Sequence, residues 1–233
     1  MTNPSGGLLG GDRLETAIEA GPGTAVSIAT QGATRVYRAG DGPPTVLTTT
    51  VAVGAAARVE WIPHHLMPYA GAAVHQRTRV DVAASGALLA WEVLCAGRSA
   101  HGERFAWRAL DTRLRVVRDG RPLLTDGAVL AAGGEPFDGA DLAATVVVVL
   151  PRTANGGAAL AIRDDPAAAL ADDLHRTLAG RRGLLAGASA PAPGLVVARL
   201  LARDAPALYA GLHALRQPAR AALGLPPAER PVA

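Results

Sequence analysis

The stretch that decides the fold is Val74-His75-Gln76-Arg77-Thr78-Arg79-Val80-Asp81-Val82, in which uncharged residues alternate with charged or ionisable ones. Successive side chains of a β-strand point to opposite faces. The alternation therefore predicts a strand with its valines on a buried face and its arginines facing solvent.

Similar short segments extend outward from this strand, from Asp12 to about Leu150, and they predict a mainly β body. Residues that tolerate turn geometry separate them, at Gly40-Asp41-Gly42-Pro43, around Gly54, at Ala70-Gly71, at Ser85-Gly86 and at Asp119-Gly120-Arg121-Pro122. This spacing suits a sandwich, a barrel or a β-solenoid. No fixed-period motif is strong enough to select among the three.

The pattern changes after Thr145–Leu150, whose four consecutive valines predict a strand buried on both faces. Asp165-Pro166 is typical of a helix start, and Leu170, Leu174 and Leu178 then recur at helical spacing until Gly180. A strand is expected over Gly194–Leu201. A second helix is expected over Asp204–Leu223, with its stripe of leucines, and Pro218 should break or kink it.

The length of 233 residues suits one domain, residues 1–233, with a β-rich body over about 1–163 and a part of helices and a strand over about 164–225. Hydrophobic residues make up 49% of the chain and charged residues 18%, which excludes a disordered protein. No apolar run reaches the roughly 20 residues of a membrane helix, and the start lacks the features of a signal peptide. One cysteine, Cys95, excludes an internal disulfide. We expect a cytoplasmic protein.

Glu92 is the acidic residue that the pattern singles out. In Leu88–Ala96 both faces of the predicted strand are apolar, so the carboxylate of Glu92 is expected to be buried, which is costly without a partner. A functional role and a structural ion pair with Arg98 or Arg104 are equal alternatives. The same two alternatives apply to Glu60, beside Trp61, and to Glu103. Taken singly, each of these residues is typical of a solvated or ion-paired side chain.

Histidines and glycines also suggest chemistry, but more weakly. His64-His65 resembles metal ligands, yet the spacing matches no known metal site, and adjacent residues of a strand point to opposite faces. The opening glycines from Gly6 to Gly11 lack the Lys and Ser/Thr that a phosphate-binding loop requires. No nucleophile elbow and no His-Glu-x-x-His pattern appears, so the motifs favour a protein that is not an enzyme.

Taken together, four stretches resemble the urease accessory protein UreD (UreH) family across most of the chain. They are Asn3-Pro4-Ser5-Gly6-Gly7-Leu8-Leu9-Gly10-Gly11-Asp12-Arg13-Leu14, Thr30-Gln31-Gly32-Ala33-Thr34-Arg35-Val36-Tyr37, Glu60-Trp61-Ile62-Pro63, and Trp91-Glu92 through Gly97-Arg98 to Gly102-Glu103-Arg104-Phe105. The resemblance implies a β-helical, solenoid-like body followed by about two C-terminal α-helices. Family members usually have further strands before the first stretch, so a short start would leave an unpaired sheet edge.

The resemblance also implies a function. Proteins of this family are scaffolds that bind apo-urease and a UreF-type protein, which recruits a UreG-type GTPase that supplies nickel. No intrinsic cofactor is implied, only transient nickel, for which a polar interior passage has been proposed in the family. The acidic positions of this chain that match family positions are Asp12, Glu15, Glu60, Glu92 and Glu103. No membrane or nucleic-acid partner is implied.

Two alternatives stay open. Buried carboxylates could act as a general acid and base in a small-molecule enzyme, which requires Glu60, Glu92 and Glu103 to converge with a histidine. The net charge of +3 admits a basic nucleic-acid-binding module, although aromatic residues for base stacking are only 3% of the chain. The basic positions of that module would be Arg176, Arg181, Arg182, Arg199 and Arg203.

Overall fold

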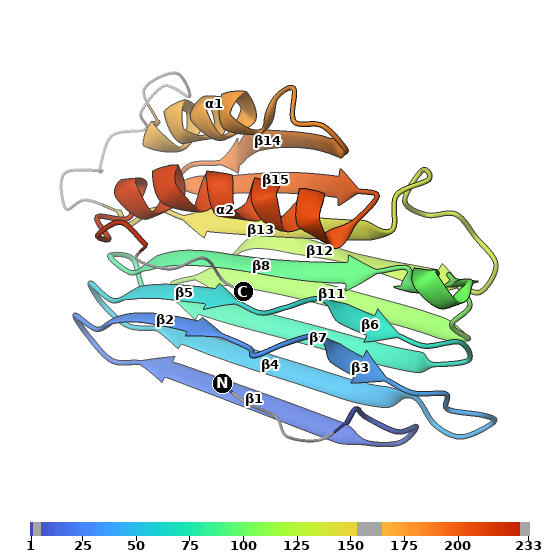
Figure 1. Cartoon of the computed structure of the whole chain (residues 1–233). Helices are drawn as coiled ribbons and strands as arrows, with labels where there is room; N and C mark the ends of the chain where they lie inside the picture. Colours follow the sequence, from blue (N-terminus) through green and yellow to red (C-terminus); the bar gives the residue numbers. More distant parts are fainter. Residues whose placement is uncertain (2–5, 153–164, 229–233) are drawn as a thin grey trace.

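The computed structural model describes residues 1, 6–152 and 165–228, and most of them form strands that wind in successive coils (Figure 1). Each coil contributes one strand to a first sheet and one or two strands to a second. The first coil comprises β1 (Arg13–Ala20), β2 (Ala25–Ala29) and β3 (Thr34–Val36); the second comprises β4 (Thr45–Val53), β5 (Arg58–Ile62) and β6 (Leu66–Pro68); the third begins with β7 (Ala73–Val82) and β8 (Ala87–Cys95).

Equivalent strands of successive coils pair in parallel. β1, β4, β7 and β11 (Ala109–Arg118) follow one another in the first sheet, and β2, β5 and β8 do so in the second. β3 pairs with β6, and β6 with β8. The body is therefore a β-solenoid of about three turns, and of the three architectures that the turn spacing admits, this is the one that the family resemblance implies.

The chain leaves the coil pattern after β11. β12 (Arg121–Ala131) turns back antiparallel to β11 and ends the first sheet, while β13 (Leu142–Val149), β15 (Leu195–Ala202) and β14 (Leu184–Ala192) extend the second sheet beyond β8. Between β8 and β11 lie the short β9 (Gly97–Arg98), η1 (Ser99–His101) and β10 (Glu103–Arg104). The predicted Thr145–Leu150 strand is β13, and its valines are buried.

Two helices lie over the extension of the second sheet, α1 (Pro166–Leu178) and α2 (Ala205–Ala222), as Figure 1 shows. Asp165 caps α1 as predicted, because its side chain accepts a hydrogen bond from the Ala167 amide at 3.0 Å. Asp204 caps α2 in the same way through the amide of Ala207. The leucine stripes of both helices are buried against the sheet.

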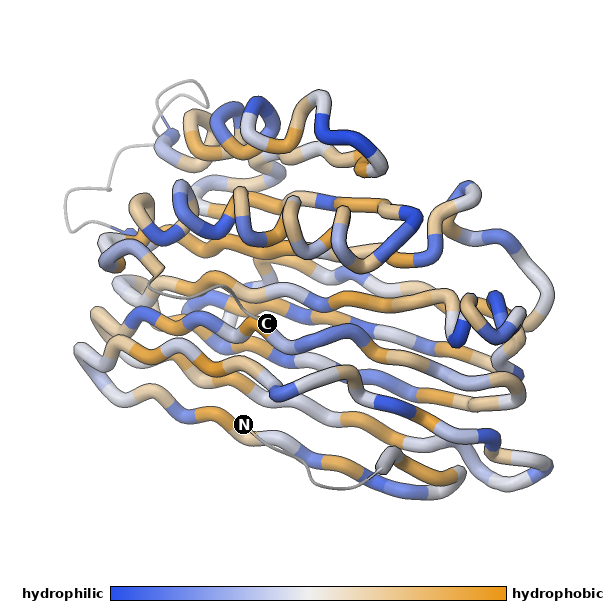
Figure 2. The backbone as a smooth tube through the Cα atoms, viewed as in Figure 1, coloured by the Kyte–Doolittle hydropathy of each residue, from blue (hydrophilic) through white to orange (hydrophobic). Residues whose placement is uncertain are grey.

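The buried apolar residues form two large layers and a third cluster around Phe105 and Trp107. The alternating colours along the strands in Figure 2 reflect this arrangement. One layer lies between the two sheets and contains Val80, Leu88 and Val116. The other lies between the second sheet and the helices and contains Trp91 and Leu212. The alternation predicted for β7 is confirmed, because Val74, Val80 and Val82 are fully or almost fully buried.

One expectation about the C-terminal part needs correction, and one strand there was not predicted. α2 continues through Pro218 and is not broken there. A proline inside a helix costs about 3 kcal/mol, whereas each of the fully buried Leu208, Leu212 and Leu215 contributes roughly 2 kcal/mol. The strand β14 was not expected, because its Ala- and Gly-rich sequence lacks β-branched residues.

Asn3, Pro4 and Ser5 of the opening motif lie outside the described residues.

A candidate functional site inside the solenoid

A cavity of about 570 Å³ lies inside the coils and is lined by all three of them. Its walls are mixed, with threonine and glutamine side chains among apolar groups such as Leu14, Leu47 and Trp61. The lining residues that matter most for chemistry are Thr16, Thr49, Gln76, Thr78, Glu92 and His64. The polar groups in this wall distinguish it from the rest of the space between the sheets, which apolar side chains fill.

Glu92 is the only carboxylate in the cavity wall among the described residues. It belongs to the face of β8 that also carries Leu88 and Ala90, as the alternation predicted, and this face points toward β7. Gln76 Nε2 donates a hydrogen bond of 2.8 Å to Glu92 Oε1, and Thr78 Oγ1 donates to the same oxygen. Two neutral donors from one neighbouring strand therefore hold the carboxyl group.

The surroundings of Glu92 favour its protonated form. Burial raises the pKa of this carboxyl group, the hydrogen bonds from Thr78 and Gln76 lower it, and the charge of Asp126 raises it further. Of the two alternatives for Glu92, the ion pair with Arg98 or Arg104 is not formed, because Arg98 pairs with Glu103 and Arg104 pairs with Asp141 and Glu135.

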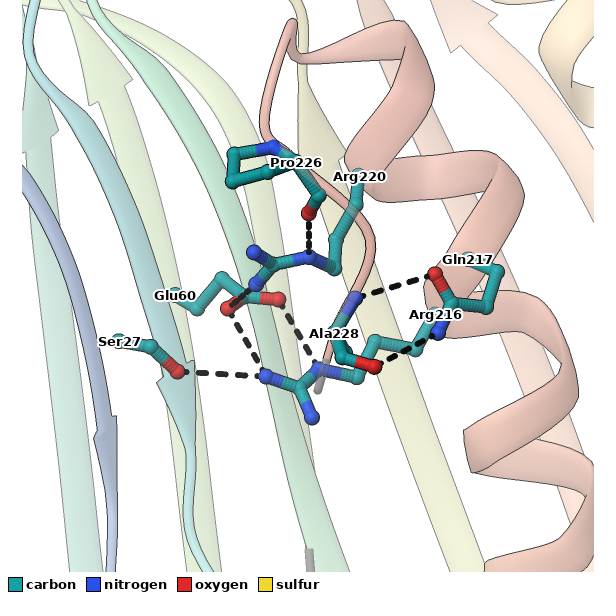
Figure 3. Close-up of polar contacts among 7 residues, drawn as sticks. All are labelled: Ser27, Glu60, Arg216, Gln217, Arg220, Pro226 and Ala228. Atoms are coloured by element: carbon teal, nitrogen blue, oxygen red, sulfur yellow. Dashed lines mark hydrogen bonds and ion pairs between the residues drawn. The ribbon is translucent and has the colours of Figure 1, made fainter. Parts of the chain in front are cut away.

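Glu60 is completely buried, but on the other side of the second sheet, beneath α2 (Figure 3). Arg216 Nε and Nη2 lie 3.1 Å and 3.0 Å from the two carboxylate oxygens, and Arg220 Nη1 also donates to Oε2. Side-chain exposure is 8% for Arg216 and 10% for Arg220. Such a group is stable only while it stays paired, because an unpaired buried charge costs several kcal/mol.

The same arginines hold the chain that follows α2. Arg220 Nε donates to the carbonyl oxygen of Pro226 at 2.7 Å, and Gln217 exchanges hydrogen bonds with the backbone of Ala228 (Figure 3). Arg58 of β5 donates to the carbonyl of Leu223 at 2.7 Å. Glu60 thus connects the second coil to the C-terminal helix, which is a structural task.

The other three acidic positions lie outside the cavity wall. Asp12 is exposed and accepts a hydrogen bond from the amide of Leu9 at 2.8 Å, which closes the turn before β1. Glu15 is exposed on the outer face of β1. Glu103 pairs with Arg98, and this pairing lowers the pKa of its carboxyl group. The structure therefore does not bring the five predicted residues together, and of the five only Glu92 lines the cavity.

A cluster of rings that the sequence did not predict lies between the β5–β6 connection and α2. Tyr209 Oη lies 3.1 Å from His65 Nδ1 and 3.2 Å from His64 Nδ1. Both histidines contact the same tyrosine because they are in a loop, where the alternation of a strand does not apply. Burial lowers the pKa of His65 to about 4, with a smaller effect of His64, and burial raises the pKa of Tyr209 to about 12.

No group of three or more His, Cys, Asp or Glu side chains in the described part of the chain is arranged to hold a metal ion. The Cys95 thiol, whose pKa burial raises to about 11, is protonated at neutral pH. None of the described helices is long and apolar enough to cross a membrane.

The arrangement required by each alternative function can be compared with the structure. Glu60, Glu92 and Glu103 do not converge, since the first is under α2, the second faces the interior and the third lies in an ion pair at β10. Arg199 lies on β15 and pairs with Asp126, whereas Arg176 lies on α1 and pairs with Asp173. These two arginines of the basic module are thus engaged on separate elements.

Comparison with known proteins identifies the family. The model of the UreD urease accessory protein family matches residues 1–232. Proteins named urease accessory protein UreD are 37% identical over 141 residues in Dechloromonas aromatica and 34% identical over 217 residues in an Anaeromyxobacter species. One named urease accessory protein UreD 3, from a Bradyrhizobium species, is 34% identical over 221 residues.

These matches cover 60%, 91% and 92% of this chain, respectively, and 46%, 68% and 73% of the relatives. The family model thus extends over almost every residue of the chain, and its description agrees with the names of the relatives. The chain belongs to the UreD urease accessory protein family.

Proposed function

We propose that this protein acts in urease maturation as a scaffold that catalyses no reaction itself. In this proposal it binds apo-urease together with a UreF-type accessory protein and a UreG-type GTPase, and it assists the insertion of nickel into the urease active site. Support comes from its membership of a family of urease accessory proteins. The step is assigned to the cytoplasm, where a single buried thiol such as Cys95 stays reduced.

The observation that carries the nickel part of the proposal is the cavity inside the solenoid, with hydroxyl and amide groups and one carboxyl group in its wall. Nickel is cargo here and not a resident cofactor. A single carboxylate with neutral oxygen donors around it binds a divalent ion more weakly than a set of imidazole or thiolate ligands does. Weak binding suits an ion that has to leave again, so we assign the contact with nickel to Glu92.

The test replaces Glu92 by Gln in cells that carry the urease genes and the other accessory genes but lack this gene. Wild-type chain is expected to restore nickel-dependent urease activity, and Glu92→Gln to restore several-fold less, because the amide keeps the volume but, unlike the carboxyl group, cannot give up a proton to bind a cation. The readouts are urease activity, urease protein and bound nickel per urease. Glu15→Gln is the matched control, since that carboxylate lies on the outer face of β1.

The outcomes separate the two parts of the proposal. No restoration by the wild-type chain would contradict the maturation role itself. Full restoration by Glu92→Gln, with the maturation role intact, would remove Glu92 from the nickel route. Co-purification of the variant with the UreF-type protein and apo-urease shows whether the variant still enters the complex.

A further inference from the structure

Two adjacent histidines and a tyrosine direct three donor atoms toward one point between the solenoid and α2. The Nδ1 atom of His65 lies 3.1 Å from Tyr209 Oη, and the Nδ1 atom of His64 lies 3.2 Å from the same oxygen. Histidines at neighbouring positions of a strand could not meet in this way, because their side chains point to opposite faces. These two lie between β5 and β6, in a connection where both rings contact Tyr209.

The spacing of these three atoms suits a metal ion. Imidazole nitrogens and anionic oxygens bind ions such as Zn²⁺ at about 2.0–2.1 Å, so neighbouring ligand atoms around one ion lie roughly 3 Å apart. Both contacts to Tyr209 Oη have about this length. An ion can therefore enter between the three atoms after small movements of the rings. Only two members of the group are His, Cys, Asp or Glu, and the third donor is a phenol oxygen.

The surroundings of these groups prepare them for an ion. An imidazole binds a metal through a neutral nitrogen, and burial lowers the pKa of His65 to about 4, so this ring is neutral at neutral pH. Burial raises the pKa of Tyr209 to about 12, so its hydroxyl keeps its proton until an ion displaces it. The backbone amide of His65 donates to Tyr209 Oη at 3.2 Å, and such a donor stabilises a phenolate.

The cavity inside the solenoid gives an ion a path to these groups. His64 belongs to the cavity wall, and its backbone amide donates a hydrogen bond of 2.9 Å to the hydroxyl of Thr30. The carbonyl oxygen of Pro63 accepts a second hydrogen bond, from Trp91 Nε1 at 2.9 Å. The connection that carries both histidines is thus held by the first and third coils, which fixes the positions of the ligands before an ion arrives.

We propose that His64, His65 and Tyr209 form a binding site for one divalent transition-metal ion, with the two Nδ1 atoms and the phenolate oxygen as ligands. The bond between Tyr209 Oη and its proton breaks as the bond between Oη and the ion forms, and the proton passes to solvent. Imidazole ligands select ions such as Ni²⁺ and Zn²⁺ over Mg²⁺, which prefers carboxylate and water oxygens.

This site is separate from the weak contact assigned to Glu92. It does not rest on the proposed function, because it requires only the ring geometry of the free chain. Two imidazoles and a phenolate bind a transition ion more tightly than one carboxyl group does. The purified chain alone therefore tests the site, and urease activation is not needed as a readout.

The experiment is isothermal titration calorimetry of the purified, metal-free full chain, without a histidine tag, with Ni²⁺ alone and with Zn²⁺ alone. At about pH 8, where an ordinary imidazole is neutral, the wild type is expected to bind one ion and to release about one proton. Titrations in buffers of different ionisation enthalpy measure that proton. His65→Asn is expected to weaken binding at least about tenfold, because one ligand is lost. His101→Asn, which removes an exposed histidine, is the matched control and binds as the wild type does.

Tyr209→Phe distinguishes a metal site from a ring cluster that only supports the fold. This variant keeps the aromatic ring but removes the third ligand, so it binds more weakly and releases no proton. Circular dichroism shows whether each variant is folded, and His64→Asn replaces His65→Asn if that variant is not. In urea denaturation, Ni²⁺ should stabilise the wild type more than any ligand variant.

Three results would overturn the site. They are a wild type that binds neither Ni²⁺ nor Zn²⁺, folded histidine variants that bind as tightly as the wild type, and a Tyr209→Phe variant with unchanged affinity and proton release. Each concerns the free chain, so each leaves the maturation role and its test through Glu92 unaffected.

Discussion

Glu60, which is fully buried, and Glu92, which is half-buried, lie on neighbouring strands of one sheet in opposite environments, and this difference assigns their roles. Glu60 meets two arginines, whereas Glu92 meets only neutral donors. The inward direction of the Glu92 side chain could be predicted from the apolar residues around it, but its partial exposure to the cavity could not. The partners of Glu60 could not, because Arg216 and Arg220 lie more than 150 positions away in the sequence.

Removal of the Glu60 carboxylate should destabilise the whole chain. Glu60→Ala leaves Arg216 and Arg220 buried without an anion, and we expect the free energy of unfolding to fall by about 3 kcal/mol or more. Urea denaturation measures this change in the free energy of unfolding. Glu103→Ala, which breaks the more exposed pair with Arg98, is the matched control and should have a much smaller effect. Equal losses for both variants would show that the cluster beneath α2 is not a major source of stability.

Individual strands and helices could be predicted where a repeating sequence pattern coincided with a face that is buried in the fold. The strands β7 and β13 and the helix α1 follow their alternation, valine run and capping signal. β14 was missed because its small residues carry no pattern, and it exists because β15 offers it an edge and α1 covers its outer face. α2 shows the reverse case, in which packing outweighs the local preference of Pro218.

This conflict within α2 gives a prediction for Pro218. Pro218→Ala supplies the amide that the helix lacks at this position and removes the clash of the ring with the preceding turn. We expect the free energy of unfolding to rise by roughly 1 kcal/mol or more. Thermal and urea unfolding of the two proteins provide the comparison, with Ala214→Pro, one turn earlier in the same helix, as the destabilising counterpart. A variant no more stable than wild type would mean that α2 is strained elsewhere.

At the scale of the whole molecule, the solenoid and the helical part are joined by contacts that no local pattern encodes. The sequence predicted a β body followed by helices, but not the sides on which they meet. Two groups of residues connect α2 to the β5–β6 region, the pairing of Glu60 with the α2 arginines and the contact of Tyr209 with His64 and His65. The second group contains ionisable rings, so this junction should respond to pH.

His65 should make the stability of the chain fall in acid. Its pKa is about 4 in the folded protein and near 6.5 in the unfolded chain, so below pH 6.5 the unfolded state binds more protons. The free energy of unfolding contributed by neutral His65 is therefore present above pH 6.5 and is lost as the pH falls toward 4, by about 3 kcal/mol in total.

Urea denaturation at several pH values between 7 and 4 measures this loss. His65→Asn, which retains a polar group near Tyr209 without a titrating ring, should flatten the dependence by that amount. His101→Asn, at an exposed position, controls for the loss of a histidine. If His65→Asn and wild type lose stability in parallel, the junction with α2 does not sense pH through this ring, and the acid sensitivity of the chain comes from its carboxylates.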